Sequence, residues 1–229
     1  MYWLFFVAIA AFILFVGFIA PRRRSRNARA GASDLATALG FELLQGREAV
    51  RRMIPADAPP SAMEDYEKMP GALRKIFESS VSGSCIAGTV DGARITICFE
   101  SRGPGKSQTT YTVVRADYPK PLPFELHIAY EDTFTRLGKA LFGLRDVETG
   151  DEEFDRAVRI KAGDEAGAKV MLGNPETKAA ILGLFALSKA ALVTNAHVQW
   201  ERQGLRFDPS GMRTVIAALV PVTRTLGNA

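Results

Sequence analysis

The chain has 229 residues, with 29 Lys and Arg, 25 Asp and Glu, and a formal net charge of +4 at pH 7. The first 30 residues hold five arginines and no acid, which leaves 24 of the 29 basic and all 25 acidic side chains to the rest. A nucleic-acid-binding domain needs a basic face on its folded body, so this balance argues against nucleic acid as a partner. An apolar content of 47% predicts one folded domain.

The N-terminus predicts a membrane anchor. Nineteen uncharged, mostly apolar residues run from Tyr2 to Ala20. As a helix this segment would span about 28 Å, close to the hydrocarbon thickness of a bilayer. We expect a transmembrane anchor at 1–21, a basic stalk with a short helix at 22–55, and a soluble α+β domain at 56–229. The basic residues after the apolar segment are Arg22, Arg23, Arg24, Arg26 and Arg29.

These five arginines also predict the orientation. Basic residues beside a span stay in the cytoplasm, so the N-terminus should face outward and the domain should be cytoplasmic, in a single-pass protein of the cell (inner) membrane. A cleaved signal peptide fits poorly, because its basic residues would precede the apolar run and a cut after Ala20 would place Phe18 at the minus-three position. The arginine cluster is either a topology signal alone or a site for anionic lipid head groups.

Short elements are expected between the stalk and the domain. Ser33 begins a helical pattern that Gly40 ends, and residues 41–44 follow as a short strand. Four prolines within residues 54–70 predict an irregular surface segment.

The domain then reads as an antiparallel sheet, beginning with a hairpin around Asp91-Gly92. Counting outward from this turn places Cys85 opposite Cys98 in a non-hydrogen-bonded pair. In a reducing cytoplasm this thiol pair should stay free, on the less buried face of the hairpin. A redox switch or a pair of metal ligands is the alternative, although two cysteines without a histidine or carboxylate in ligand spacing are a weak metal signal.

Two further strands are predicted, over residues 109–116 and 124–130. The second alternates apolar and polar residues, which places His127 on the exposed side. The glycine-containing loop at 102–107 resembles a phosphate-binding loop, but the glycine expected five residues before the Gly-Lys pair is replaced by Glu100. We therefore predict an ordinary hairpin loop there.

After a predicted short helix at 132–143 comes the most acidic part of the chain. Alternating carboxylates suggest a Ca²⁺ loop, but the position that needs glycine for the sharp turn holds Asp151. We favour a solvated turn with Phe154 in the core, and keep a cation site as the alternative. The weak metal-ligand candidates are Asp146, Glu148, Asp151 and Asp155.

The C-terminal third is predicted to be rich in helix. Asn174-Pro175 begins a helix that should reach about Leu192. Lys178 and Lys189 leave only ten residues uncharged between them, too few for a second membrane span. A strand at 195–201 is expected to pair with residues 204–207, followed by a terminal helix from Ser210 that Pro221 kinks or breaks. His197, in the strand, is expected to have a packing role.

The expected segments follow in the order of an anchor, a sheet, the segment Gly150-Asp151-Glu152-Glu153-Phe154-Asp155, a β run and a Leu-rich helix. This order resembles that of uncharacterised bacterial membrane-anchored proteins that share a domain of unknown function. The resemblance covers roughly residues 83–226. It implies a bacterial-type membrane and structural roles for Asp151, Phe154 and Asp155, and it implies no activity.

Sequence motifs of hydrolases, zinc proteases, dinucleotide-binding enzymes and dithiol oxidoreductases are absent from the chain. We therefore expect a non-enzymatic interaction or accessory subunit of a membrane complex, without catalytic residues or a cofactor. Its expected partners are the lipid bilayer and a protein in or at the membrane. Two alternatives stay open: a membrane-tethered hydrolase or metal-dependent enzyme that uses residues 146–155, and an anionic-lipid-binding module that uses the arginine cluster.

Overall fold

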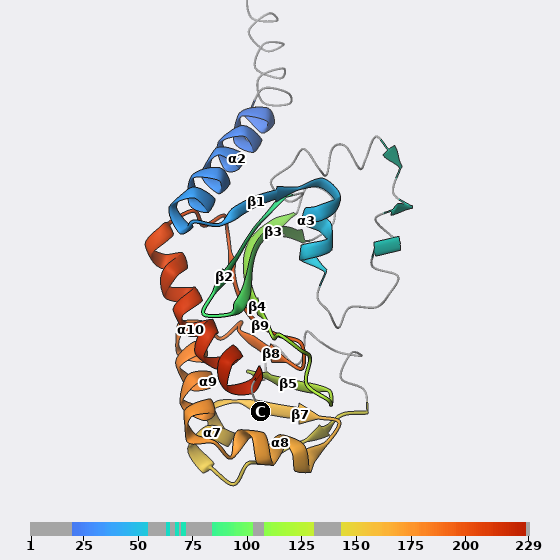
Figure 1. Ribbon diagram of the computed structural model, residues 1–229, viewed down its shortest axis with the longest axis vertical. Helices are drawn as coiled ribbons and strands as arrows, with labels where there is room; N and C mark the ends of the chain where they lie inside the picture. The colour runs from blue at the N-terminus through green and yellow to red at the C-terminus, as the bar shows by residue number, and fades with distance from the viewer. Residues whose placement is uncertain are drawn as a thin grey trace, which may run out of the picture.

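The computed structural model describes residues 20–54, 63–64, 67–68, 70–71, 84–102, 108–130 and 143–227. They form an α+β fold built on one nine-stranded antiparallel sheet, which confirms the predicted sheet packed with helices (Figure 1). The strands are β1 (Glu42–Gln45), β2 (Ser84–Val90), β3 (Ala93–Arg102), β4 (Thr109–Asp117), β5 (Leu126–Ala129), β6 (Arg145–Asp146), β7 (Arg159–Ala162), β8 (Leu192–Thr194) and β9 (His197–Gln203). The helices are α2 (Ala20–Leu39), α3 (Gly46–Met53), α7 (Glu152–Ala157), α8 (Glu165–Leu172), α9 (Pro175–Leu187) and α10 (Pro209–Gly227).

Several predicted features lie wholly or mostly outside these residues. They are the membrane anchor at 1–21, of which only Ala20 and Pro21 are described, the proline-containing segment, the loop at 102–107 and the helix at 132–143. Among the helices that are described, none combines the length and the apolar character that a membrane span requires.

The strand order is β1-β2-β3-β4-β9-β8-β5-β7-β6. The β2–β3 hairpin has the predicted register, with Val90 opposite Ala93 and Cys85 opposite Cys98. Asp91 and Gly92 form its turn with φ angles of 49° and 83°, in the left-handed region that two-residue hairpin turns require. The sheet therefore follows chain order from β1 to β4 and departs from it at β9.

The two faces of the sheet are covered differently. One face packs against α2, α9 and α10 and holds the main core, which includes Ile97, Val114 and Leu219, all without exposed surface. The other face is covered near β1, β2 and β3 by α3, over a smaller cluster that includes Ala49. Figure 1 shows α9 and α10 on one side of the strands and α3 on the other.

Helix α2 starts earlier than the helix predicted from Ser33. It runs from Ala20 through the arginine-rich stretch to Leu39, and Gly40 follows with φ +70° as its C-terminal cap. Its C-terminal half packs into the main core, where Ala32 and Leu35 have no exposed surface. A single helix thus continues from the end of the apolar N-terminal run into the centre of the domain.

Two predictions in the C-terminal third are wrong. Helix α9 ends at Leu187 instead of about Leu192, because residues 192–194 enter the sheet as β8 between β9 and β5. Strand β9 does not pair with residues 204–207; it pairs with β4 and β8, and Gly204 leaves the strand with φ +92°.

The terminal helix α10 begins at Pro209, next to the predicted Ser210, and continues through Pro221 to Gly227. Proline removes one backbone donor from a helix. The packing of Leu219 and Val222, both without exposed surface, holds the helix together on either side of Pro221.

Candidate functional site

Polar side chains cross the α3-covered face of the sheet, one from each neighbouring strand. We call this set the polar row. It contains both histidines of the chain, which flank Thr194 on either side. Its members, in strand order, are Arg94, Asp117, His197, Thr194, His127, Lys161 and Asp146.

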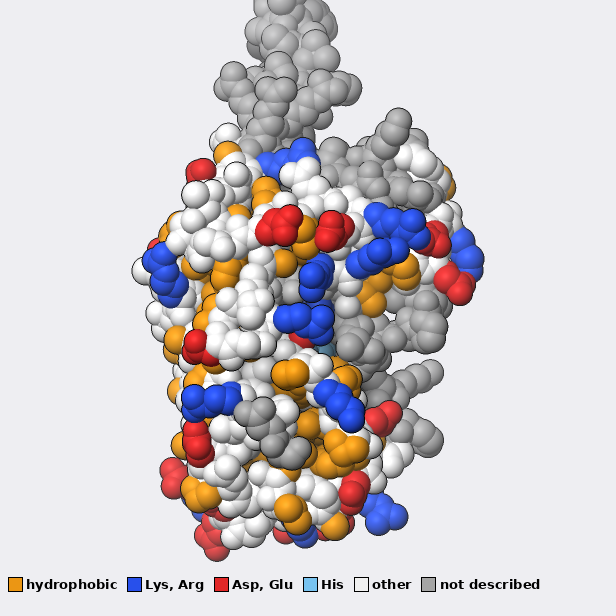
Figure 2. Space-filling model, viewed as in Figure 1, with side chains coloured by type: hydrophobic (Ala, Val, Ile, Leu, Met, Phe, Trp, Pro, Cys, Tyr) orange, Lys and Arg blue, Asp and Glu red, His pale blue; other side chains and the backbone are white. Residues whose placement is uncertain are grey.

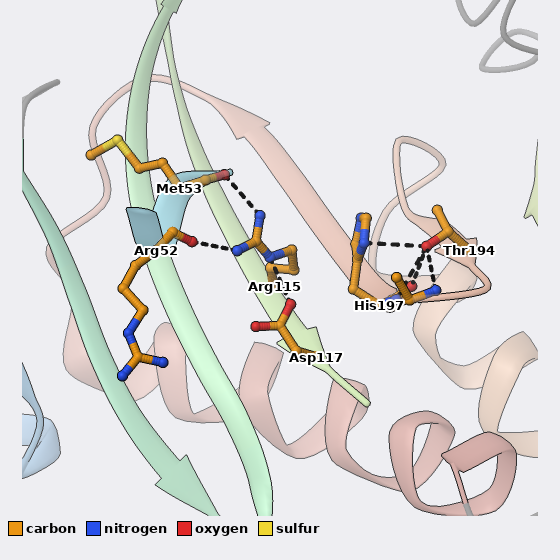
Figure 3. Close-up of polar contacts among 7 residues, drawn as sticks. Arg52, Met53, Arg115, Asp117, Thr194 and His197 are labelled. Atoms are coloured by element: carbon orange, nitrogen blue, oxygen red, sulfur yellow. Dashed lines mark hydrogen bonds and ion pairs between the residues drawn. The ribbon is translucent and has the colours of Figure 1, made fainter. Parts of the chain in front are cut away.

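Arg115 lies beside the polar row and is the most highly connected buried charge on this face. Its side chain is 6% exposed, and its Nε donates to Oδ1 of Asp117 at 2.8 Å. Its two terminal nitrogens donate to the backbone oxygens of Met53, at 2.9 Å, and of Arg52 (Figure 3). Because the last carbonyl groups of a helix lack intrahelical donors, the guanidinium caps α3 and fixes it to the sheet.

Thr194 and His197 close the β8–β9 turn. The Thr194 hydroxyl oxygen accepts the backbone N–H groups of Ala196 and His197, both at 3.1 Å, and lies 3.2 Å from Nδ1 of His197. With Asp117 as the register neighbour of His197, the set has the residue types of a hydroxyl–imidazole–carboxylate relay. However, Thr194 is 2% exposed and its oxygen is held by backbone donors, so its contacts stabilise the turn.

The acidic segment around 146–155 is an ordered turn beside α9. Both oxygens of Asp155 accept hydrogen bonds, from the N–H and hydroxyl of Thr149 and from the N–H of Gly150, at 2.8 to 3.0 Å. Asp151 caps α7 through the N–H of Phe154 and accepts a hydrogen bond from Lys178 at 2.9 Å. The bond from Lys178 is the main cause that lowers the pKa of Asp151. As predicted, Phe154 is buried, with 1% exposure.

A hollow of about 320 Å³ adjoins this turn, lined by Asp146, Glu148 and Asp155 together with Arg159. Arg159 donates to Asp146 at 3.1 Å, and this bond lowers the pKa of that carboxyl. Within the described ranges, no group of three or more His, Cys, Asp or Glu side chains is arranged to hold a metal ion.

The two cysteines are brought together as predicted, on the less buried face of the hairpin, where Thr89 and Arg94 are exposed, but the pair itself is buried. Cys85 has no exposed surface and Cys98 is 3% exposed. The reason is α3, whose Ala49 packs against this pair. His127, also predicted to be exposed, is half-buried.

Of the arginine cluster, Arg29 is the member whose side chain the structure describes. It is half-buried, and its guanidinium donates to the side chain of Gln45 in β1. Arg22, Arg23, Arg24 and Arg26 lie in the first two turns of α2.

A second hollow, of about 410 Å³, lies between the end of α2, the β2–β3 turn and α10. Its walls include Phe41, Val90 and Val220, and Arg213 and Arg224 lie at its edge. On the face that Figure 2 shows, charged side chains of both signs are interspersed with apolar ones, in agreement with the near-neutral charge of the domain.

No protein-family model matches this chain, and no curated protein sequence matches it. Among solved structures, the chain is similar to the crystal structure of the mycobacterial trehalose monomycolate transport factor A, TtfA. The TM-score is 0.49 and the identity 8%, over 87% of this chain and 93% of that chain. A similarity at this level assigns neither a family nor a function. These results do not contradict the resemblance drawn from residues 150–155.

Sequence reasoning missed the polar row and the role of Arg115. Both depend on which strands are neighbours, and β9 and β8 insert between β4 and β5, far from their place in the chain order. One member of the row, His127, had a signal in the sequence. The alternation of apolar and polar residues in β5 places it on the face opposite the core side chains of that strand.

Proposed function

We propose that this chain is a single-span membrane protein whose cytoplasmic domain acts as a non-enzymatic interaction or accessory subunit of a membrane complex. The observation that carries the proposal is the continuity of α2. This helix begins at Ala20, the last residue of the apolar N-terminal run, and ends within the main core of the domain. A domain joined to its anchor by one packed helix is held in a set orientation, which suits a protein that presents a surface to membrane partners.

The contacts of the polar side chains support a non-enzymatic role. The buried guanidinium of Arg115 caps a helix, the Thr194 hydroxyl closes a turn, and Asp151 and Asp155 hold the turn before α7. Each of these groups is used by the fold, whereas a catalytic group must present a reactive atom to a substrate.

The proposed topology is tested by labelling introduced cysteines in intact cells. Val170 is 82% exposed, so Val170→Cys should react with a membrane-impermeant maleimide only after the membrane is permeabilised. Tyr2→Cys, at the other end of the proposed span, should react in intact cells. Labelling of Val170→Cys in intact cells would contradict the cytoplasmic assignment.

The proposed role is tested by purifying the full-length protein in mild detergent at native expression level, followed by mass spectrometry. We expect a second protein to be recovered in stoichiometric amount. The same pair should be recovered when the affinity tag is placed on that second protein instead. The matched control is a chain of the same length whose apolar segment is replaced by glycine and serine, which cannot span a bilayer and should lose the partner. Recovery of the chain alone in lipid nanodiscs as well as in detergent would count against an accessory role.

The second candidate function is a membrane-tethered hydrolase or metal-dependent enzyme, and the hollow beside Asp146, Glu148 and Asp155 is the place to test it. Calorimetric titration of the full-length protein with Ca²⁺, Mg²⁺ and Mn²⁺ would support it if binding is lost in Glu148→Gln and kept in Glu176→Gln, an exposed glutamate elsewhere. An equal response of both variants would remove the acidic segment as a metal site.

A further inference from the structure

Cys85 and Cys98 are positioned for direct reaction with each other. They lie opposite one another in β2 and β3 as the sixth pair from the hairpin turn, at a non-hydrogen-bonded position. The Cα atoms of such a pair are about 4.5 Å apart, within the range of about 4.4 to 6.8 Å that a disulfide bond spans. The two side chains also share the small buried cluster beneath α3.

Helix α3 covers this pair. The Cys85 thiol donates to the backbone oxygen of Ala49 at 3.7 Å, and both cysteines belong to the small cluster beneath the helix. An external reagent can reach the sulfur atoms only when α3 moves, because Cys85 has no exposed surface and Cys98 is 3% exposed.

The attachment of α3 is weak enough for such movement. The helix has eight residues, of which Ala49 and Val50 are buried, so it contributes little apolar area. Its C-terminal end depends on the hydrogen bonds from Arg115 to the oxygens of Arg52 and Met53. Segments with few buried apolar contacts open at a lower free energy than the core does.

The two thiols also differ in acidity. Interaction with the neighbouring Cys98 thiol lowers the pKa of Cys85, whereas interaction with Cys85 and burial raise the pKa of Cys98. Since the thiolate is the nucleophile in thiol–disulfide exchange, Cys85 is the attacking residue and Cys98 the resolving one.

We propose that Cys85 and Cys98 form a redox-active dithiol that α3 covers and that reacts with a small disulfide, such as glutathione disulfide, when α3 leaves the sheet. The Cys85 sulfur attacks one sulfur of the external disulfide, whose other half leaves as a thiolate and takes the proton that Cys85 loses. Cys98 then attacks the mixed disulfide at Cys85, gives up its proton, and releases the second external thiol. Two thiols are oxidised to one disulfide, and one external disulfide is reduced to two thiols.

Oxidation acts on α3 in turn. A disulfide has no S–H group, so the bond from Cys85 to the Ala49 oxygen, a direct polar contact between β2 and α3, is lost. The oxidised protein should therefore hold α3 less firmly than the reduced protein, and this inference is independent of the proposed membrane role.

The test uses the full-length protein in lipid nanodiscs, incubated with glutathione disulfide and followed by intact mass and peptide mapping. We expect the loss of two hydrogens and a Cys85–Cys98 peptide, and accumulation of glutathione on Cys85 in Cys98→Ser. Arg115→Lys, which cannot make the same forked contacts, should oxidise about tenfold faster because α3 opens more readily. The control Arg94→Lys, at an exposed arginine on the same face, should match the unmodified protein.

Circular dichroism decides whether Arg115→Lys is folded. If Arg115→Lys is not folded, Asp117→Asn is used in its place, because this change weakens the contact that Asp117 makes with the Arg115 guanidinium. Three results would each overturn the proposal. Glutathione disulfide could produce no Cys85–Cys98 disulfide, or Cys98→Ser could carry no mixed disulfide with glutathione. The third is that the folded variant, Arg115→Lys or Asp117→Asn, is oxidised at the same rate as Arg94→Lys.

Discussion

Gly88 is the position at which the addition of one methyl group should affect the fold most directly. The strand β2 has a glycine there because the ring of Phe41 packs against its backbone. A Cβ atom at residue 88 would stand 2.2 to 2.5 Å from three ring atoms of Phe41. Carbon atoms in contact are normally about 3.5 to 4.0 Å apart, so the ring must move by more than 1 Å.

We expect Gly88→Ala to reduce the free energy of unfolding by about 1 to 3 kcal/mol, the range for an overfilled packing site. Extended backbone suits alanine, and the loss of glycine's freedom in the unfolded chain offsets about 0.4 to 1 kcal/mol of the cost. Phe41 also lines the hollow beside α10, into which its ring can turn, and this places the net value near the lower end of the range.

The assay is urea unfolding of the full-length protein in nanodiscs, followed by circular dichroism. The double-mutant cycle with Phe41→Leu identifies the cause, because a smaller side chain removes the clash. The double variant should be more stable than the sum of the single effects predicts, by about 1 kcal/mol. Gly183→Ala is the control: this glycine lies in α9 with open space at its Cβ, so alanine should stabilise the protein by about 0.5 to 1 kcal/mol. Additive effects of Gly88→Ala and Phe41→Leu would refute the reasoning.

Three further predictions concern buried and charged side chains. Arg115→Met should cost about 3 to 5 kcal/mol in urea unfolding, since the Asp117 carboxylate, 14% exposed, then loses its guanidinium partner; a cost below 1 kcal/mol would show that α3 does not depend on the guanidinium. Phe154→Ala should cost about 3 to 5 kcal/mol, because the ring is 1% exposed, and an effect within 0.5 kcal/mol would contradict its place in the core. Arg159 lowers the pKa of Asp146, so their pair stabilises the protein above the unfolded pKa of about 3.9 and this contribution is lost as pH falls through the lower folded value. Thermal unfolding should therefore show a smaller loss between pH 5 and pH 2 in Asp146→Asn than in the unmodified protein, and equal losses would exclude the pair.

Local patterns were sufficient for the elements whose partners are near in sequence. The turn at Asp91-Gly92 determined the register of β2 and β3 residue by residue, because a two-residue hairpin leaves no freedom in the pairing. The Asn174 cap and Gly40 likewise predicted where α9 begins and α2 ends. In each case the energetic preference lies within a few consecutive residues.

The errors arise where distant segments compete. Leu192 to Thr194 continue an apolar helical pattern, but the sheet has a place for them between β5 and β9, and the backbone hydrogen bonds of two neighbours favour the strand. Similarly, the cysteine pair is buried although its face is the less buried one, because it is covered by α3, which is separated from β2 by about thirty residues of chain. The contacts of Arg115 were beyond sequence reasoning for the same reason.

Because α2 is continuous, it fixes the rotation of the domain about the helix axis as well as the distance of the domain from the first turns of the helix. A helix of 20 residues is about 30 Å long, and each residue added to it turns whatever follows by about 100°. One alanine inserted near Asn27 would point the sheet in a different direction relative to the first turns of the helix, while seven would return it close to its original direction about 10 Å farther along the axis. If a partner binds the domain in one fixed orientation, the activity of the protein across such an insertion series should rise and fall with the period of the helix. If the domain acts alone, its activity should be the same for every insertion.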